Sequence, residues 1–376
     1  MEFRRVLFRS TLQKPAAVYR AVERAMLTLA SPGRGGYPAA MAAAEEAYRC
    51  RETAAALFGL SEPERVVFCQ NATHGLNIAI KALARPGERV VISGYEHNAV
   101  LRPLRALEAR IRVAAAPPFE PAAAAEAYHR ELKQGAALAV VNHVSNVFGC
   151  IQPVEEIAAL CGERGIPLIV DASQSAGVLP LRPEEWNAAF VAMPGHKGLY
   201  GPQGTGLLLV GRQPGDRRIR TLMEGGSGSS PREPDMPDWL PDRLEAGTHN
   251  MPGIAGLRAG LEFVKRLGPE AILAHEEKLV HLAAELLGEN PRLRVFAAAE
   301  PFRQGGVLSF QVKDMDCETA AARLAERGFS LRAGLHCAPL AHDTAGTGKE
   351  GTVRMSVSAF SRESHVRRLA KALENL

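Results

Sequence analysis

Short apolar runs alternate with helical patterns between residues 39 and 211. The runs rich in Val, Ile, Leu and Ala lie at residues 65–70, 89–93, 137–143, 166–171, 188–193 and 206–211. Helical patterns, for example at residues 39–57, 71–83 and 155–164, precede or separate them. Strands that are apolar throughout and joined by helices form a mostly parallel sheet covered on both faces. The alternation therefore predicts an α/β fold whose ligands bind at the carboxyl ends of the strands.

Residues 225–241 are rich in Gly, Ser and Pro and predict a loop after this first region. Helices and short strands alternate again up to the C-terminus, which predicts a second, smaller α/β domain. We assign residues 11–250 to a large domain, whose first residues pack with the small one, and residues 251–376 to the small domain. Residues 1–10, MEFRRVLFRS, begin with basic residues like a signal peptide, but their apolar part is too short. We interpret them as a foreign or misassembled extension.

Composition excludes several classes of protein. The chain is 46% hydrophobic and 23% charged, with a net charge of +4 and no basic stripe, which indicates neither a nucleic-acid nor a membrane partner. Its six cysteines show no Cys-x-x-Cys spacing, which argues against disulfides and a metal site. No apolar run reaches the roughly 18 residues of a membrane helix. We expect a cytoplasmic enzyme with a small-molecule substrate.

One lysine lies where a lysine is seldom found. Lys197, in VAMPGHKGLYGPQGTG, follows an apolar strand and is surrounded by glycines, and Asp171 ends the strand before it. A desolvated lysine has a lowered pKa and can act as an amine nucleophile, while a buried aspartate can pair with a protonated ring nitrogen. Pyridoxal phosphate needs both groups and a phosphate cradle. The helix that begins near residue 71, with the hydroxyl of Thr73, is a suitable cradle.

A set of motifs then resembles a known family. The motifs NATHGLN, EHNAVLRPL, NHVSNVFG, DASQSAG, GHKGLYGPQGTG, EAGTHN and RAGLHCAPLAH…GTVRMS occur in the order that this family shows. Together they resemble the cysteine desulfurase and selenocysteine lyase branch of the class V aminotransferases, from about Thr11 to the C-terminus. The resemblance implies fold type I with a seven-stranded, mostly parallel sheet, pyridoxal 5'-phosphate as cofactor, and a homodimer.

The resemblance also assigns roles around the cofactor ring. It makes Lys197 the Schiff-base lysine, Asp171 the partner of the ring nitrogen, and Gln174 a donor to the phenolic oxygen. His97 stacks on the ring and moves protons. The groups implied to hold the phosphate are Thr73, His196, the backbone amides near Ala72 and His74, and Thr248 of the neighbouring subunit. The family usually has Ser or Thr three residues before the lysine, where this chain has Pro194, which lacks a hydroxyl and a backbone N–H.

The same resemblance describes the substrate side. Asn146 contacts the ring oxygen and the substrate carboxylate, which Arg354 grips as a bidentate fork. Cys337 is the nucleophile that takes up sulfur, and Arg332 beside it favours a thiolate or binds the carboxylate. The implied reaction converts L-cysteine to L-alanine, with the sulfur held as a persulfide on Cys337 for an acceptor protein. L-Selenocysteine is a further possible substrate.

Other interpretations remain open. Asp171 could be a helix cap, His97 and His196 could be core histidines, Arg354 could belong to an ion pair, and Cys337 could be structural. The chain could also be another class V pyridoxal-phosphate enzyme, such as a selenocysteine lyase, aminotransferase or epimerase. A degenerate, non-catalytic homologue is the third alternative.

Overall fold

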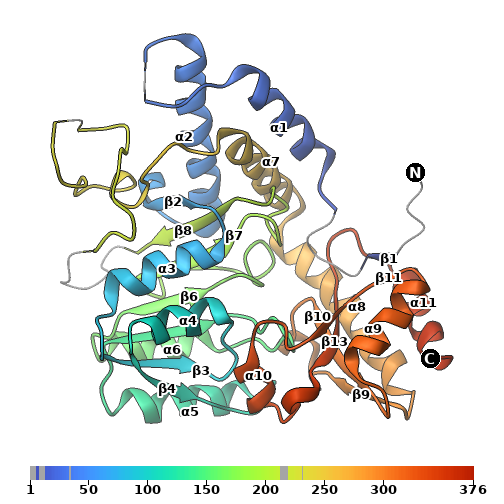
Figure 1. Ribbon diagram of the computed structural model, residues 1–376. Helices are drawn as coiled ribbons and strands as arrows, with labels where there is room; N and C mark the ends of the chain where they lie inside the picture. Colours follow the sequence, from blue (N-terminus) through green and yellow to red (C-terminus); the bar gives the residue numbers. More distant parts are fainter. Residues whose placement is uncertain (1–5, 8–12, 34, 212–218, 231) are drawn as a thin grey trace.

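A seven-stranded sheet forms the centre of the larger part of the molecule (Figure 1). The computed structural model describes residues 6–7, 13–33, 35–211, 219–230 and 232–376. In spatial order the strands are β2 (Val66–Cys69), β8 (Gly206–Val210), β7 (Phe190–Pro194), β6 (Leu168–Asp171), β5 (Leu138–Asn142), β3 (Arg89–Ser93) and β4 (Arg110–Ala114). Strand β8 runs antiparallel to its neighbours, and the other pairs of adjacent strands are parallel. The predicted α/β fold with a mostly parallel sheet is confirmed.

Helices cover both faces of this sheet because its central strands are apolar on both faces. In β5, Ala139 and Val141 belong to the core on one face, and Leu138 and Val140 to the core on the other. The first face packs against α2 (Pro38–Phe58), α5 (Pro121–Leu132), α6 (Val154–Gly162) and α7 (Met251–Leu267). The second face packs against α3 (Ala72–Leu83) and α4 (Asn98–Ala106), and α1 (Ala16–Thr28) lies against α7.

The C-terminal part, coloured orange to red in Figure 1, forms a second, smaller group of strands and helices beside the large sheet. Its antiparallel sheet has the order β12 (Arg332–Gly334), β13 (Thr352–Ser356), β10 (Val307–Val312) and β9 (Leu293–Phe296). Its core is shared with α8 (Pro269–Gly288), α9 (Cys317–Glu326) and α11 (Glu363–Glu374). The remaining helices are α10 (Pro339–Thr344) and the short helices η1 (Pro63–Arg65), η2 (Asp242–Leu244), η3 (Pro301–Arg303) and η4 (Gly348–Glu350).

The segments at the assigned domain boundaries contact other parts of the molecule. Helix α7 contributes Met251, Ile254, Leu257 and Leu261 to the core of the large sheet. Strand β1 (Val6–Leu7) pairs in parallel with β11 (Phe329–Ser330) of the C-terminal part. The domain boundary after residue 250 and the foreign origin of residues 1–10 stay predictions. Among the helices described, none is both long and apolar enough to span a membrane.

Candidate active site

A polar cavity of about 210 Å³ lies at the carboxyl ends of the large sheet's strands. Asp171 and Pro194 are the last residues of β6 and β7, and the loop after β7 carries Lys197. Parallel strands end at the same edge of a sheet, so segments distant in sequence meet here. Of the predicted site residues, the cavity is lined by Ala72, Thr73, His97, Asn146, Asp171, Gln174, His196, Lys197 and Arg332.

Asp171 and Lys197 form the electrostatic centre of this cavity. Asp171 is buried, with 4% of its surface exposed, and its Oδ1 accepts the backbone N–H of Ser173 at 2.9 Å. Burial lowers the pKa of Lys197 to about 8, against the opposing effect of Asp171, and the cations Arg354 and Arg332 lower it further. The amine is therefore neutral at a lower pH than an ordinary lysine, as a nucleophile or base requires.

Glycine fixes the turn that presents Lys197. A Cβ atom added to Gly198 would lie 2.3 Å from the carbonyl oxygen of Ala176, and one added to Gly177 would lie 2.4 Å from the carbonyl oxygen of Gly198. Both distances are far inside van der Waals contact, so the two backbone segments pass one another only because both positions are glycine. The Lys197 carbonyl also accepts the backbone N–H of Tyr200 at 2.9 Å, which closes the turn.

His97 has a defined hydrogen-bonding state. It caps α4, and its Nδ1 accepts the backbone N–H of Ala99 at 3.0 Å. Because Nδ1 accepts this bond, the ring carries its proton on Nε2, and burial lowers the pKa of the imidazole. The preceding residue, Glu96, is buried and accepts hydrogen bonds from Ser93 Oγ (2.6 Å) and the backbone N–H of Asn142 (2.7 Å). Sequence analysis did not single out Glu96, although it directly precedes His97 in the EHNAV motif.

The start of α3 fits an anionic group. Asn71 caps the helix by accepting the backbone N–H of His74 at 2.9 Å, while the first-turn amides of Ala72 and Thr73 have no acceptor within the helix itself. Across the cavity, His196 Nδ1 is buried without a hydrogen-bond partner among the described residues. Burial, with Lys197 and Lys14 nearby, lowers the pKa of His196 to about 4, so its ring is neutral. These groups fit the phosphate of pyridoxal phosphate.

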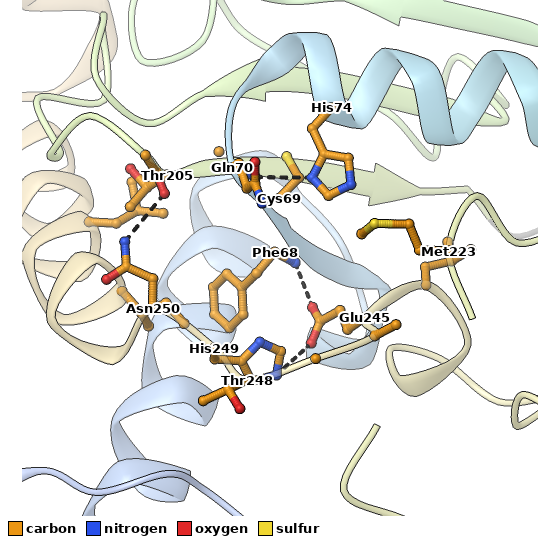
Figure 2. Close-up of a pocket in the computed structure, with 17 residues that line it drawn as sticks. Phe68, Cys69, Gln70, His74, Thr205, Met223, Glu245, Thr248, His249 and Asn250 are labelled. Atoms are coloured by element: carbon orange, nitrogen blue, oxygen red, sulfur yellow. Dashed lines mark hydrogen bonds and ion pairs between the residues drawn. The ribbon is translucent and has the colours of Figure 1, made fainter. Parts of the chain in front are cut away.

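The structure places His74 differently from Ala72 and Thr73, which line the polar cavity. Its backbone N–H is already bonded to Asn71, and its ring accepts the backbone N–H of Gln70 at 3.3 Å. The side chain lines a different cavity, of about 150 Å³ (Figure 2). The helical turn explains the difference, because consecutive residues of a helix point in different directions.

Thr248 also lies away from the polar cavity of its own chain. It lines the cavity of Figure 2 together with His249, Glu245 and Phe68. Glu245 is held by Arg51 through two hydrogen bonds of 2.9 and 2.7 Å, and by His249 at 3.1 Å. Contact of Thr248 with the phosphate of a neighbouring subunit stays a prediction.

The Arg51–Glu245 pair allows a stability prediction. Burial alone would raise the pKa of Glu245, but Arg51 and His249 hold it below its usual range. A lowered carboxyl pKa stabilises the fold above the unfolded-state pKa, and that stabilisation is lost as the pH falls through the folded-state pKa. We expect Glu245→Gln to lower the free energy of unfolding at pH 7 by about 3 kcal/mol, because Arg51 is left buried without a counter-charge.

Urea unfolding at pH 7 and at about pH 3.5 measures this effect, since the difference between the variant and the parent should be smaller in acid. Glu233→Gln, at an exposed position, is the control and should change little at either pH. Equal stability of Glu245→Gln and the parent at pH 7 would show that the pair contributes nothing.

Cys337 lies beside the polar cavity, on the loop between β12 and α10. It is exposed, while the other five cysteines are buried. Arg332 Nη2 lies 3.4 Å from Cys337 Sγ, and Arg332 also lines the cavity, so one side chain connects the thiol to the cavity. Arg354 lies opposite Arg332 in the antiparallel pairing of strands β12 and β13. Its Nη1 donates to the carbonyl of Asn146 at 2.6 Å. Asn146 Oδ1 is buried without a partner among the described residues.

Sequence analysis also did not identify a second lysine with a lowered pKa, Lys14. Burial lowers the pKa of Lys14 to about 8, and its Nζ donates to the carbonyl oxygen of His196 at 2.7 Å. Lys14 lines an apolar groove beside α1 instead of the polar cavity. No local motif marks this residue, because its burial comes from a contact with a segment far along the chain.

Comparisons with known proteins agree with this geometry. The sequence model of the aminotransferase class-V family matches residues 7–369. The chain is 30% identical to a probable cysteine desulfurase of Methanothermobacter thermautotrophicus, over 98% of this chain and 93% of that protein. It is 29% identical to a cysteine desulfurase of Serratia proteamaculans, over 98% and 91% respectively.

Solved structures show the same similarity. A cysteine desulfurase from Thermococcus onnurineus, determined without ligand, superposes with a TM-score of 0.90 at 28% identity, covering 99% of this chain and 94% of that one. A cysteine desulfurase from Escherichia coli, 23% identical, gives a TM-score of 0.83, with coverage of 99% and 94%, and supports the fold alone.

Proposed function

Since the chain belongs to the cysteine desulfurase branch of the class-V aminotransferase family, we propose that it converts L-cysteine to L-alanine and holds the sulfur as a persulfide on Cys337. The observation that carries the proposal is the contact of Arg332 with both the exposed thiol of Cys337 and the cavity that contains Lys197 and Asp171. A nucleophilic sulfur is useful to this reaction only if it lies next to the site where the substrate is activated.

The residues present fit pyridoxal phosphate, which supplies, when bound, an electron sink for bonds broken at the substrate α-carbon. Lys197 would bond to the cofactor, Asp171 would pair with its ring nitrogen, and Gln174 would donate to its phenolic oxygen. His97 would lie against the ring. Thr73, His196 and the first amides of α3 would hold the phosphate.

The chain's own groups then carry the proton and sulfur transfers. Arg354, with Asn146 and Arg332, orients the substrate carboxylate. Once the amino group of the substrate has taken its place on the cofactor, the free, neutral amine of Lys197 removes the α-proton and later returns it to the α-carbon. The thiolate of Cys337 attacks the substrate sulfur, so that an S–S bond forms as the C–S bond breaks and its electron pair stays with the carbon skeleton. The β-carbon takes up a proton, which balances the one that Cys337 lost in forming its thiolate. Alanine leaves, and the persulfide on exposed Cys337 remains accessible to an acceptor protein.

Incubation with L-cysteine tests the proposal directly. Alanine should form, and mass spectrometry of the trapped protein should show one added sulfur on Cys337. Release of pyruvate or a keto acid without alanine would favour another class V reaction. Absence of any change in cofactor absorption on adding L-cysteine would favour a non-catalytic homologue.

We further propose that the protein works as a homodimer. Large apolar side chains are exposed on α1 and α2, among them Leu27 (80%), Met26 (71%) and Tyr19 (59%). Such a set on neighbouring helices is typical of a surface that another chain covers. In this arrangement Thr248 of one subunit would complete the phosphate site of the other.

We expect Thr248→Ala to weaken cofactor retention about tenfold, the effect of losing one hydrogen bond to a charged group. Dialysis followed by absorbance measures retention, and light scattering measures mass. Thr221→Ala is the control, because Thr221 lies in the same part of the chain and contacts Glu224 instead. A parent protein that is monomeric in light scattering would contradict the dimer. A Thr248→Ala variant that keeps its cofactor as well as the parent does would contradict the role of Thr248.

A further inference from the structure

The loop that carries Cys337 contains a buried histidine to which the proposed reaction assigns no role. His336 is 2% exposed, although it lies between Leu335, which is 41% exposed, and the exposed Cys337. A polar ring is buried at a cost unless it makes hydrogen bonds. The partners of this ring therefore indicate why the loop holds it inside the protein.

A chain of hydrogen bonds fixes the state of the ring. Ser309 Oγ donates to the carbonyl of Val147 at 2.6 Å, so it accepts the hydroxyl of Thr352 at 3.2 Å. Thr352 Oγ1 has used its proton and can only accept from His336 Nε2, at 3.0 Å. The Thr352 carbonyl accepts from the same nitrogen at 3.1 Å. Nε2 therefore carries a proton, and the ring is neutral because burial, together with Arg354 and Arg332, lowers its pKa to about 2.

The backbone of the same loop needs external support. His336 and Cys337 have φ angles of +51° and +58°, a left-handed conformation that is unfavourable for residues with side chains. The His336 carbonyl accepts from Asn146 Nδ2 at 2.9 Å, and the Cys337 carbonyl accepts the backbone N–H of Asn98 at 2.7 Å. In this conformation Cys337 Sγ lies beside Arg332.

We propose that His336 is a positioning residue for Cys337: its Nε2–H bond to Thr352 holds the loop in the left-handed conformation that keeps the thiol against Arg332. The inference rests on the proposed function, since it assumes that Cys337 is the nucleophile. It goes further because it names the side chain that orients the nucleophile, and because it places the anchor on β13, the strand that also carries Arg354.

The test uses two pairs of variants. His336→Leu removes the donor of both bonds to Thr352, and Thr352→Val removes the hydroxyl acceptor but keeps the carbonyl, whereas His336→Gln keeps an N–H donor at a similar reach and Thr352→Ser keeps the hydroxyl. The rates of alkylation by iodoacetate and iodoacetamide are measured for each protein, and only Cys337 is exposed to these reagents. Arg332 beside the thiol favours the anionic reagent, so the iodoacetate-to-iodoacetamide ratio reports their proximity independently of how accessible the loop is.

We expect the ratio to fall several-fold in His336→Leu, to fall less in Thr352→Val, which keeps the carbonyl acceptor, and to stay near that of the parent in the Gln and Ser variants. The kcat for alanine formation should fall about tenfold in His336→Leu, and less in Thr352→Val, with KM unchanged, because the thiol acts after the substrate binds. The double variant should lose no more than His336→Leu alone, since that change already removes the donor of both bonds.

An unchanged reagent ratio together with unchanged kcat in both deletion variants would overturn the proposal, as would a double variant whose loss equals the product of the single losses. If His336→Leu does not fold, Thr352→Val carries the test, because it removes one hydroxyl and keeps the carbonyl acceptor. Failure of the proposed function would be visible separately, as a parent protein that forms no alanine, while the reagent ratio would still decide the role of His336.

Discussion

Replacement of Lys197 by Ala is expected to lower alanine formation from L-cysteine by at least about a thousandfold, within the range that a positioned acid–base group contributes. Lys197 combines a place in the polar cavity, the neighbouring carboxylate Asp171, and a pKa lowered by burial to about 8. The variant should still fold, because losing a half-buried amine leaves the glycine-dependent turn around it intact. Amino-acid analysis of the product measures the rate.

Lys14 provides the decisive comparison for this prediction. Burial gives it a similarly lowered pKa, but it lies outside the polar cavity. Borohydride reduction of the cofactor-loaded protein, followed by peptide mapping, should attach the cofactor to Lys197 and leave Lys14 unlabelled. Lys265→Ala, at an exposed position on α7, should behave like the parent. A label on Lys14, or full activity of Lys197→Ala, would refute the assignment.

The strands that the sequence predicts are those buried on both faces. The runs at residues 137–143 and 188–193 correspond to β5 and β7, whose ends differ from the predicted ones by one or two residues. Every residue of these two strands is buried, so the apolar pattern is continuous and easy to recognise. Strand β4, with the sequence RIRVA, was not predicted. It lies at the edge of the sheet and only its last residue is buried, so arginines interrupt the apolar pattern that identifies the central strands.

The cofactor side of the site was predictable for a topological reason. Asp171, His97 and Lys197 all follow strands of one parallel sheet, and the fold brings such positions to a common edge. The side of the cavity that faces Cys337 was less predictable. The bond from His336 to Thr352 joins a loop to a strand and depends on a chain of hydroxyl groups that ends at Val147. No periodicity or local motif encodes such an arrangement.

Replacement of Cys337 by Ala is expected to separate substrate binding from sulfur transfer. The variant should still bind L-cysteine, seen as a change in cofactor absorption, because the groups proposed to hold the cofactor and the substrate carboxylate remain. Alanine and persulfide formation should fall about a thousandfold or more, as happens when an enzyme loses its nucleophile. Cys161→Ala is the control: this cysteine is buried in α6, so its loss should affect stability and leave the rate unchanged.

Selenocysteine makes the same experiment quantitative. Selenium leaves carbon as an anion more readily than sulfur does, so it depends less on nucleophilic attack by Cys337. The Cys337→Ala variant should therefore lose much less activity with L-selenocysteine than with L-cysteine, and the ratio of the two losses measures how far the thiol assists C–S cleavage. Because both substrates use the same cavity and the same Lys197, a general defect in folding or cofactor binding would reduce both rates equally. If Cys337→Ala forms alanine from L-cysteine at the parent rate, the thiol takes no part in breaking the C–S bond, and another class V reaction becomes the better assignment.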